Sequence, residues 1–216
     1  MPHRWYIGDI DKRLFLNAPS FPQLAAIKSL HTRHYIHRDI KPANFMIPVD
    51  SPSPVSFLVD FGLAQRFCNP TAYLHTPYSP HNLIVSTLLF TSIVGQQGDT
   101  QSHRDDLESL AYMIIYIARR KLPWTSCRGT KAVLQKKLGV PIEELCRGLP
   151  PPFCDFVTYV RLLGFDEKPD YQHLHSLLSL CSETESKSDQ PINAPPSVHV
   201  PVSIKHKHTP VVSDHV

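Results

Sequence analysis

The chain has 216 residues, of which 42% are hydrophobic and 19% are charged, a composition that excludes a wholly disordered protein. The formal net charge of +3 is too small to indicate a nucleic-acid-binding or membrane-binding protein by itself. No run approaches the ~20 apolar residues that span a membrane, so we expect a soluble globular protein without nucleic-acid or membrane partners.

The first predicted helix covers residues 21–31. Ser20 has the form of a helix N-cap, and the apolar residues behind it recur at helical spacing. These residues are Leu24, Ile27 and Leu30. Residues 1–20 have no hydrophobic period, so this N-terminal segment has no assignment.

Two short strand-like runs follow, at residues 45–47 and 55–59. Three prolines separate the runs, and no regular element tolerates them together. They are Pro48, Pro52 and Pro54. The sequence therefore predicts a small β-hairpin with a proline-stiffened loop.

A central helix is predicted from Asp106, where apolar residues nearly encircle the helix axis, so it should be buried on most faces. Further helical stretches are predicted over residues 141–146, 152–163 and 171–181. From residue 182 to residue 216 the chain is polar and rich in proline, which predicts a disordered tail. We expect one folded region over residues 21–181 that is mainly α with a small β-hairpin.

The densest chemical signal is I-H-R-D-I-K-P-A-N at residues 36–44, which matches the H-R-D-x-K-x-x-N catalytic loop of protein kinases. D-F-G follows at Asp60, Phe61 and Gly62. Phosphoryl transfer needs a carboxylate that orients the attacking hydroxyl, a cation near the phosphoryl group, and oxygen ligands for magnesium. The candidates for these roles are Asp39 and Lys41 as catalytic residues, and Asn44 and Asp60 as Mg²⁺ ligands. The competing interpretation is that both motifs are remnants kept for packing.

The sequence S-H-R-D-D-L-E-S-L at residues 102–110 resembles the start of the central helix of the casein kinase 1 family, and L-P-W at residues 122–124 is similar as well. The resemblance covers roughly residues 23–180. It implies a Ser/Thr protein kinase that uses ATP and Mg²⁺ and acts on a protein substrate. Lys41, two residues after Asp39, also favours Ser/Thr over Tyr specificity.

The same resemblance implies supporting roles around the catalytic loop. Asp106 would hold the backbone of the turn at His37 and Arg38. Thr87 would form a hydrogen bond near Asp39. The full set of expected supporting residues is His37, Arg38, Phe61, Gly62, Thr87 and Asp106.

The region before the catalytic loop lacks the usual features of an ATP site. Gly8 is the only glycine before Asp39, so no G-x-G-x-x-G phosphate loop precedes it. The sequence A-A-I-K at residues 25–28 looks like the strand with the ATP-pairing lysine, but Lys28 lies too close to Asp39 and within the first predicted helix. We expect a kinase-like carboxy-terminal lobe without the β-rich amino-terminal lobe, a truncated kinase with weak or no activity alone.

Two functions remain open. The intact catalytic residues favour a protein kinase lineage. The missing glycine loop, and Leu89 where casein kinase 1 proteins have a basic residue, favour a pseudokinase-like scaffold that docks a protein partner. We expect a monomer or a partner-bound chain. The five cysteines form an odd set without a C-x-x-C pair, which favours reduced thiols and a cytoplasmic or nuclear location.

Overall fold

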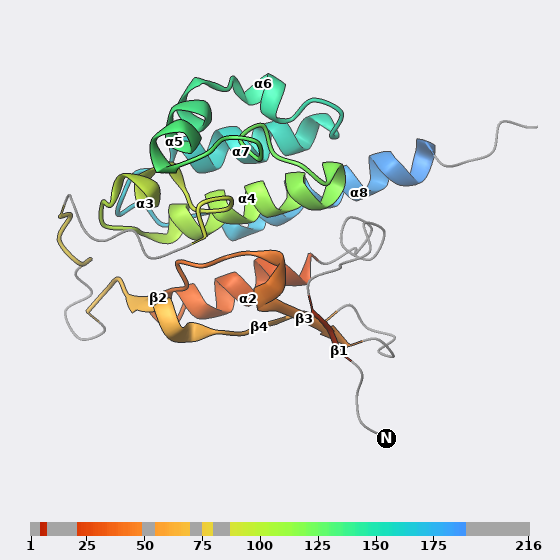
Figure 1. Ribbon diagram of the computed structural model, residues 1–216. Helices are drawn as coiled ribbons and strands as arrows, with labels where there is room; N and C mark the ends of the chain where they lie inside the picture. The colour runs from red at the N-terminus through yellow and green to blue at the C-terminus, as the bar shows by residue number, and fades with distance from the viewer. Residues whose placement is uncertain (1–4, 8–20, 49–54, 70–74, 80–86, 189–216) are drawn as a thin grey trace, which may run out of the picture.

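The computed structural model describes residues 5–7, 21–48, 55–69, 75–79 and 87–188. The α-helices of this part are α2 (Pro22–His31), α3 (Ile93–Gln97), α4 (His103–Arg119), α5 (Thr130–Gly139), α6 (Ile142–Leu145), α7 (Pro151–Leu162) and α8 (Tyr171–Ser188). The strands and 3-10 helices are β1 (Trp5–Ile7), β2 (Tyr35–Ile36), η1 (Pro42–Asn44), β3 (Phe45–Pro48), β4 (Phe57–Leu58), η2 (Phe61–Leu63) and β5 (Gln65–Arg66). Figure 1 shows α2 and the strands on one side of the molecule and α3 to α8 on the other. The fold is mainly α with a small β component.

The predicted hairpin is present as the antiparallel pair β3 and β4, with Phe45 opposite Leu58 and Met46 opposite Phe57. Residues 49–54, which hold much of the predicted loop, lie outside the described residues. On its other edge, β3 pairs with β1, so the sheet order is β1-β3-β4. Strand β1 belongs to the N-terminal segment that had no assignment. A second antiparallel pair, β2 with β5, flanks the catalytic-loop sequence.

Helix α2 begins one residue after Phe21, which has a left-handed backbone (φ 37°) and provides no side-chain cap. The predicted cap, Ser20, lies outside the described residues. The buried face of α2 includes Leu24, Ile27 and His31, and Phe21 is also buried. The position of α2 is therefore set by burial of this face rather than by a side-chain N-cap.

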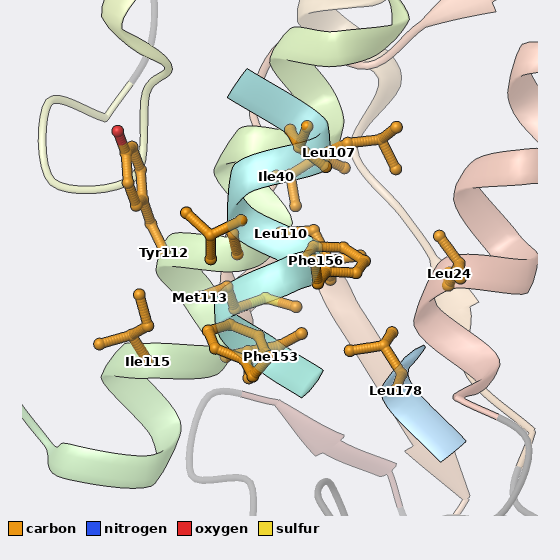
Figure 2. Close-up of a cluster of buried hydrophobic side chains, with 14 of the residues drawn as sticks. Leu24, Ile40, Leu107, Leu110, Tyr112, Met113, Ile115, Phe153, Phe156 and Leu178 are labelled. Atoms are coloured by element: carbon orange, nitrogen blue, oxygen red, sulfur yellow. The ribbon is translucent and has the colours of Figure 1, made fainter. Parts of the chain in front are cut away.

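Helix α4 is the centre of the hydrophobic core, and it is buried on most faces, as its apolar pattern predicts. Asp105 accepts a hydrogen bond from the backbone N–H of Ser102 (2.7 Å), which satisfies one of the free N–H groups at the helix start. Figure 2 shows the side chains that meet around α4, among them Leu24 of α2, Leu107 and Leu110 of α4, Phe153 and Phe156 of α7, and Leu178 of α8. Burying one such side chain contributes about 1.5–3 kcal/mol, so this cluster makes α4 a rigid base for the loops that it touches.

One predicted helix boundary needs correction, and two helices were not predicted. Helix α8 continues to Ser188, so the boundary predicted at Cys181 is wrong; the rest of the predicted tail, residues 189–216, lies outside the described residues. Helices α3 and α5 were not predicted. Among the described residues, no helix has the length and apolarity needed to cross a membrane.

Candidate active site

The catalytic-loop sequence forms a tight turn, and a side chain of α4 binds the backbone of this turn. Arg38 has a left-handed conformation (φ 67°), which costs roughly 1–2 kcal/mol in a residue with a side chain. The buried carboxylate of Asp106 accepts hydrogen bonds from the backbone N–H groups of His37 (2.7 Å) and Arg38 (2.8 Å). Burial raises the pKa of Asp106, but hydrogen bonds from His31, His37 and Arg38 outweigh burial, and the net pKa is below its ordinary value. The ionised carboxylate therefore stabilises the strained turn.

His31, at the end of α2, is a site residue that sequence analysis missed. Its Nε2–H donates to Asp106 (2.8 Å), and its Nδ1 contacts the hydroxyl of Tyr171 in α8. His31 thus joins α2, α4 and α8 behind the catalytic loop. Its only signal in the sequence is a polar residue at an inward position of the first helix. Lys28, on the same helix, is exposed, as its helix assignment predicts.

The side chains of the turn connect it to the D-F-G sequence. The buried His37 donates from Nε2 to the carbonyl of Val59 (3.0 Å), and its ring meets the edge of the Phe61 ring. Arg38 donates from Nε to the carbonyl of Leu63 (2.7 Å). Burial lowers the pKa of Arg38, and the charge of Asp106 opposes this effect. These contacts fix residues 59–63 relative to the catalytic loop.

The structure brings four of the candidate site residues into one polar cluster. Lys41 Nζ lies 2.5 Å from Asp39 Oδ2, and Asn44 Nδ2 donates to the same oxygen (3.1 Å) and to the Asp39 carbonyl (2.8 Å). The Thr87 hydroxyl donates to Asp39 Oδ1 (3.3 Å) and accepts from Lys41 Nζ (3.4 Å). The carboxylate of Asp39 is therefore held on both oxygens, and the amino group of Lys41 lies beside it.

Asn44 and Asp60 lie at the same end of the β3–β4 hairpin. The N–H of Val59 donates to the carbonyl of Asn44 (2.9 Å). Asp60 is the next residue after Val59, so its backbone begins at this hydrogen bond. Asp60 is exposed and has a left-handed backbone (φ 63°), and its Oδ1 accepts from the N–H of Gly62 (3.4 Å). An amide oxygen and a carboxylate are hard ligands that suit Mg²⁺, which takes its other ligands from water and substrate phosphates. The described residues contain no group of three His, Cys, Asp or Glu that could hold a metal by themselves, and a two-ligand site for Mg²⁺ needs none.

Comparisons with known proteins identify the family of this chain. The family model of the protein kinase domain matches residues 22–153. The chain is 39% identical over 162 residues to casein kinase I homolog 3 of Schizosaccharomyces pombe, an alignment that covers 71% of this chain and 37% of that relative. The chain thus spans well under two thirds of the length of this curated relative. With its catalytic loop and its D-F-G sequence within or beside these matches, the chain belongs to the protein kinase family and is similar to casein kinase I.

Proposed function

We propose that this chain is a casein kinase 1-like carboxy-terminal lobe that contributes the phosphoryl-transfer residues of an ATP- and Mg²⁺-dependent Ser/Thr protein kinase. The observation that carries the proposal is the cluster in which Asp39 contacts Lys41, Asn44 and Thr87. Asp39 orients the hydroxyl of the protein substrate and accepts its proton, and Lys41 stabilises the negative charge of the transferred group. Mg²⁺, when held by Asn44 and Asp60, neutralises charge on the phosphates of ATP.

We propose low activity for this chain alone. The sequence before Asp39 has no glycine-rich phosphate loop, and Lys28 lies on the exposed face of α2. Catalysis of phosphoryl transfer depends on positioning and electrostatic stabilisation, and losing one preorganised donor lowers the rate by about 10² to 10³. Nucleotide binding is therefore the more sensitive assay for this chain, because it does not depend on turnover. Phosphorylation is the more demanding assay, because it requires the complete reaction.

Calorimetric titration with ATP in the presence and absence of Mg²⁺ tests the proposal on the full 216-residue chain. We expect binding that requires Mg²⁺ and weakens at least about 10-fold in Asp60→Ala. Asp166, also acidic and exposed, provides the matched control Asp166→Ala, which should bind like the original chain. In a casein phosphorylation assay on the same samples, Asp39→Asn should lower turnover about 10²-fold or more while ATP still binds. A folded chain that binds no ATP at any Mg²⁺ concentration contradicts the proposal.

A pseudokinase-like scaffold is the second candidate function. It is favoured by the exposure of large apolar side chains on the hairpin and within the D-F-G sequence: Val55 (40%), Phe57 (48%) and Phe61 (52%). Such side chains suit contact with another protein. A scaffold would keep its partner in pull-down experiments when Asp39→Asn abolishes chemistry, and it would bind without ATP. We also propose a cytoplasmic or nuclear location, because the cysteines are all free thiols.

A further inference from the structure

The residues 87–92, here called the 87–92 turn, present Thr87 to the catalytic cluster. Within the turn, the carbonyl of Thr87 accepts from the N–H groups of Phe90 (3.0 Å) and Thr91 (3.2 Å). Trp124 Nε1–H donates to the carbonyl of Leu89 (2.8 Å). The backbone of the turn is therefore held by hydrogen bonds within the turn and by one from the side chain of Trp124.

The side chain of Lys137 in α5 donates two further hydrogen bonds to the backbone of the turn. Its side chain is fully buried, and Nζ donates to the carbonyls of Leu88 (2.7 Å) and Thr91 (2.6 Å). The amino group lies 5.3 Å from the ring centroid of Tyr112 and 5.3 Å from that of Trp124. One side chain thus joins the two ends of the turn, from a position 46 residues away from Thr91 in the sequence.

Burying the amino group of a lysine costs free energy, because the charged form loses its hydration. Burial lowers the pKa of Lys137 from 10.5 to about 7, and the charge of Glu108 opposes this shift. Both the neutral and the charged amine keep the two N–H donors that the carbonyls need. Removing the lysine would leave the carbonyls of Leu88 and Thr91 without this donor, and each carbonyl that stays buried and unpaired costs free energy. Because both carbonyls belong to one turn, the loss of Lys137 should act first on the local geometry of the 87–92 turn.

We propose that Lys137 is a positioning residue that fixes the 87–92 turn and thereby holds the Thr87 hydroxyl against Asp39 and Lys41. The inference deepens the proposed kinase function and rests on it for its catalytic consequence. Thr87 contacts Asp39 and Lys41, to which the proposed function assigns the substrate hydroxyl and the transferred phosphoryl group. Substitution of Lys137 should therefore change the KM for the protein substrate or the turnover rate. It should not change ATP binding through Asn44 and Asp60.

The test compares Lys137→Met and Lys137→Gln with Lys136→Met, a control on the same helix in which an exposed lysine is replaced. Amide hydrogen exchange of peptides covering residues 87–97 is followed by mass spectrometry on the full chain, with urea unfolding of the same samples. We expect exchange in the 87–97 peptides to rise at least about 10-fold in Lys137→Met. The loss of one hydrogen bond to a charged donor changes the equilibrium between the closed and open turn by about this factor. Lys137→Gln should show a smaller rise, and Lys136→Met none. Casein phosphorylation should show a raised KM for casein or a lowered kcat, with the KM for ATP unchanged.

Each outcome decides the proposal. Exchange that rises more in residues 87–97 than in the rest of the chain, in a Lys137→Met variant that still unfolds cooperatively in urea, supports a positioning role, and an equal rise throughout the chain overturns it. Unchanged exchange in Lys137→Met overturns it. Loss of the whole fold in both Lys137 variants also overturns it, since Lys137 would then act on the core and not on the turn. A chain that shows neither ATP binding nor phosphorylation would refute the proposed function, while the exchange data would still decide whether Lys137 positions the turn.

Discussion

Replacement of Asp106 should destabilise the protein strongly, because a single buried carboxylate serves three N–H donors. In Asp106→Ala the backbone N–H groups of His37 and Arg38 lose their acceptor, as does Nε2–H of His31. A buried donor left without a partner costs about 1–3 kcal/mol. The two backbone groups alone give a loss of roughly 4 kcal/mol, within a range of about 2–6 kcal/mol. This is a large fraction of the ~5–15 kcal/mol by which domains are stable.

Urea unfolding followed by circular dichroism measures this loss directly. Asp106→Asn keeps one acceptor oxygen and should lose about half as much, whereas the control Asp155→Ala, at an exposed position of α7, should change the free energy of unfolding by less than about 0.5 kcal/mol. The pKa of Asp106 is lowered on folding from 3.8. Its contribution is therefore present above that pH and is lost as the pH falls through the lower folded-state value. A loss below about 1 kcal/mol in Asp106→Ala would refute the reasoning that this carboxylate holds the catalytic turn.

Three further predictions concern the core and its buried polar groups. Phe156→Ala should cost about 3–5 kcal/mol in urea unfolding, since the ring is fully buried; a loss under about 1 kcal/mol would contradict its place in the core. Trp124→Phe removes the N–H that reaches the carbonyl of Leu89, and amide exchange in residues 87–97 should rise about 10-fold; equal exchange would argue against this bond. Burial lowers the pKa of His103 from 6.5 to about 3, so the unfolded chain binds more protons between these values and stability falls as the pH drops below 6.5. His103→Gln should flatten this slope by up to about 1.4 kcal/mol per pH unit, and an unchanged slope would rule out His103 as its source.

The residues of the candidate site were the easiest to identify from the sequence, and the structure brings Asp39, Lys41 and Asn44 into contact. Asp39, Lys41, Asn44 and Asp60 stand at spacings that phosphoryl transfer and a two-strand hairpin require, so residue type and position agree. The central helix was equally clear, because apolar residues around its whole circumference indicate burial on most faces. Both predictions use local patterns in which neighbouring residues carry the information.

The family resemblance indicated the contacts of Asp106 and Thr87 with the catalytic loop, but the other supporting contacts were less predictable, because they join residues far apart in the sequence. Helix α5 has only Val133 and Lys137 among its buried residues, so no apolar stripe marks the helix. A lysine is normally read as a surface residue, and its partners are backbone carbonyls, which have no sequence signal. His31 and Asp106 are likewise 75 residues apart. Such contacts are fixed by tertiary packing and become visible only in the structure.

The β3–β4 pairing has a consequence for sequence variation among related kinases. Cross-strand pairing of Phe45 with Leu58 and of Met46 with Phe57 sets where Asn44 and Asp60 lie. The cost of a longer connection grows only slowly with its length. Relatives should therefore differ in the number of residues between these strands more freely than in the strands themselves. An insertion at residues 49–54 should leave the Mg²⁺-dependent ATP binding that we propose unaltered, whereas a single-residue deletion inside β4 should abolish it.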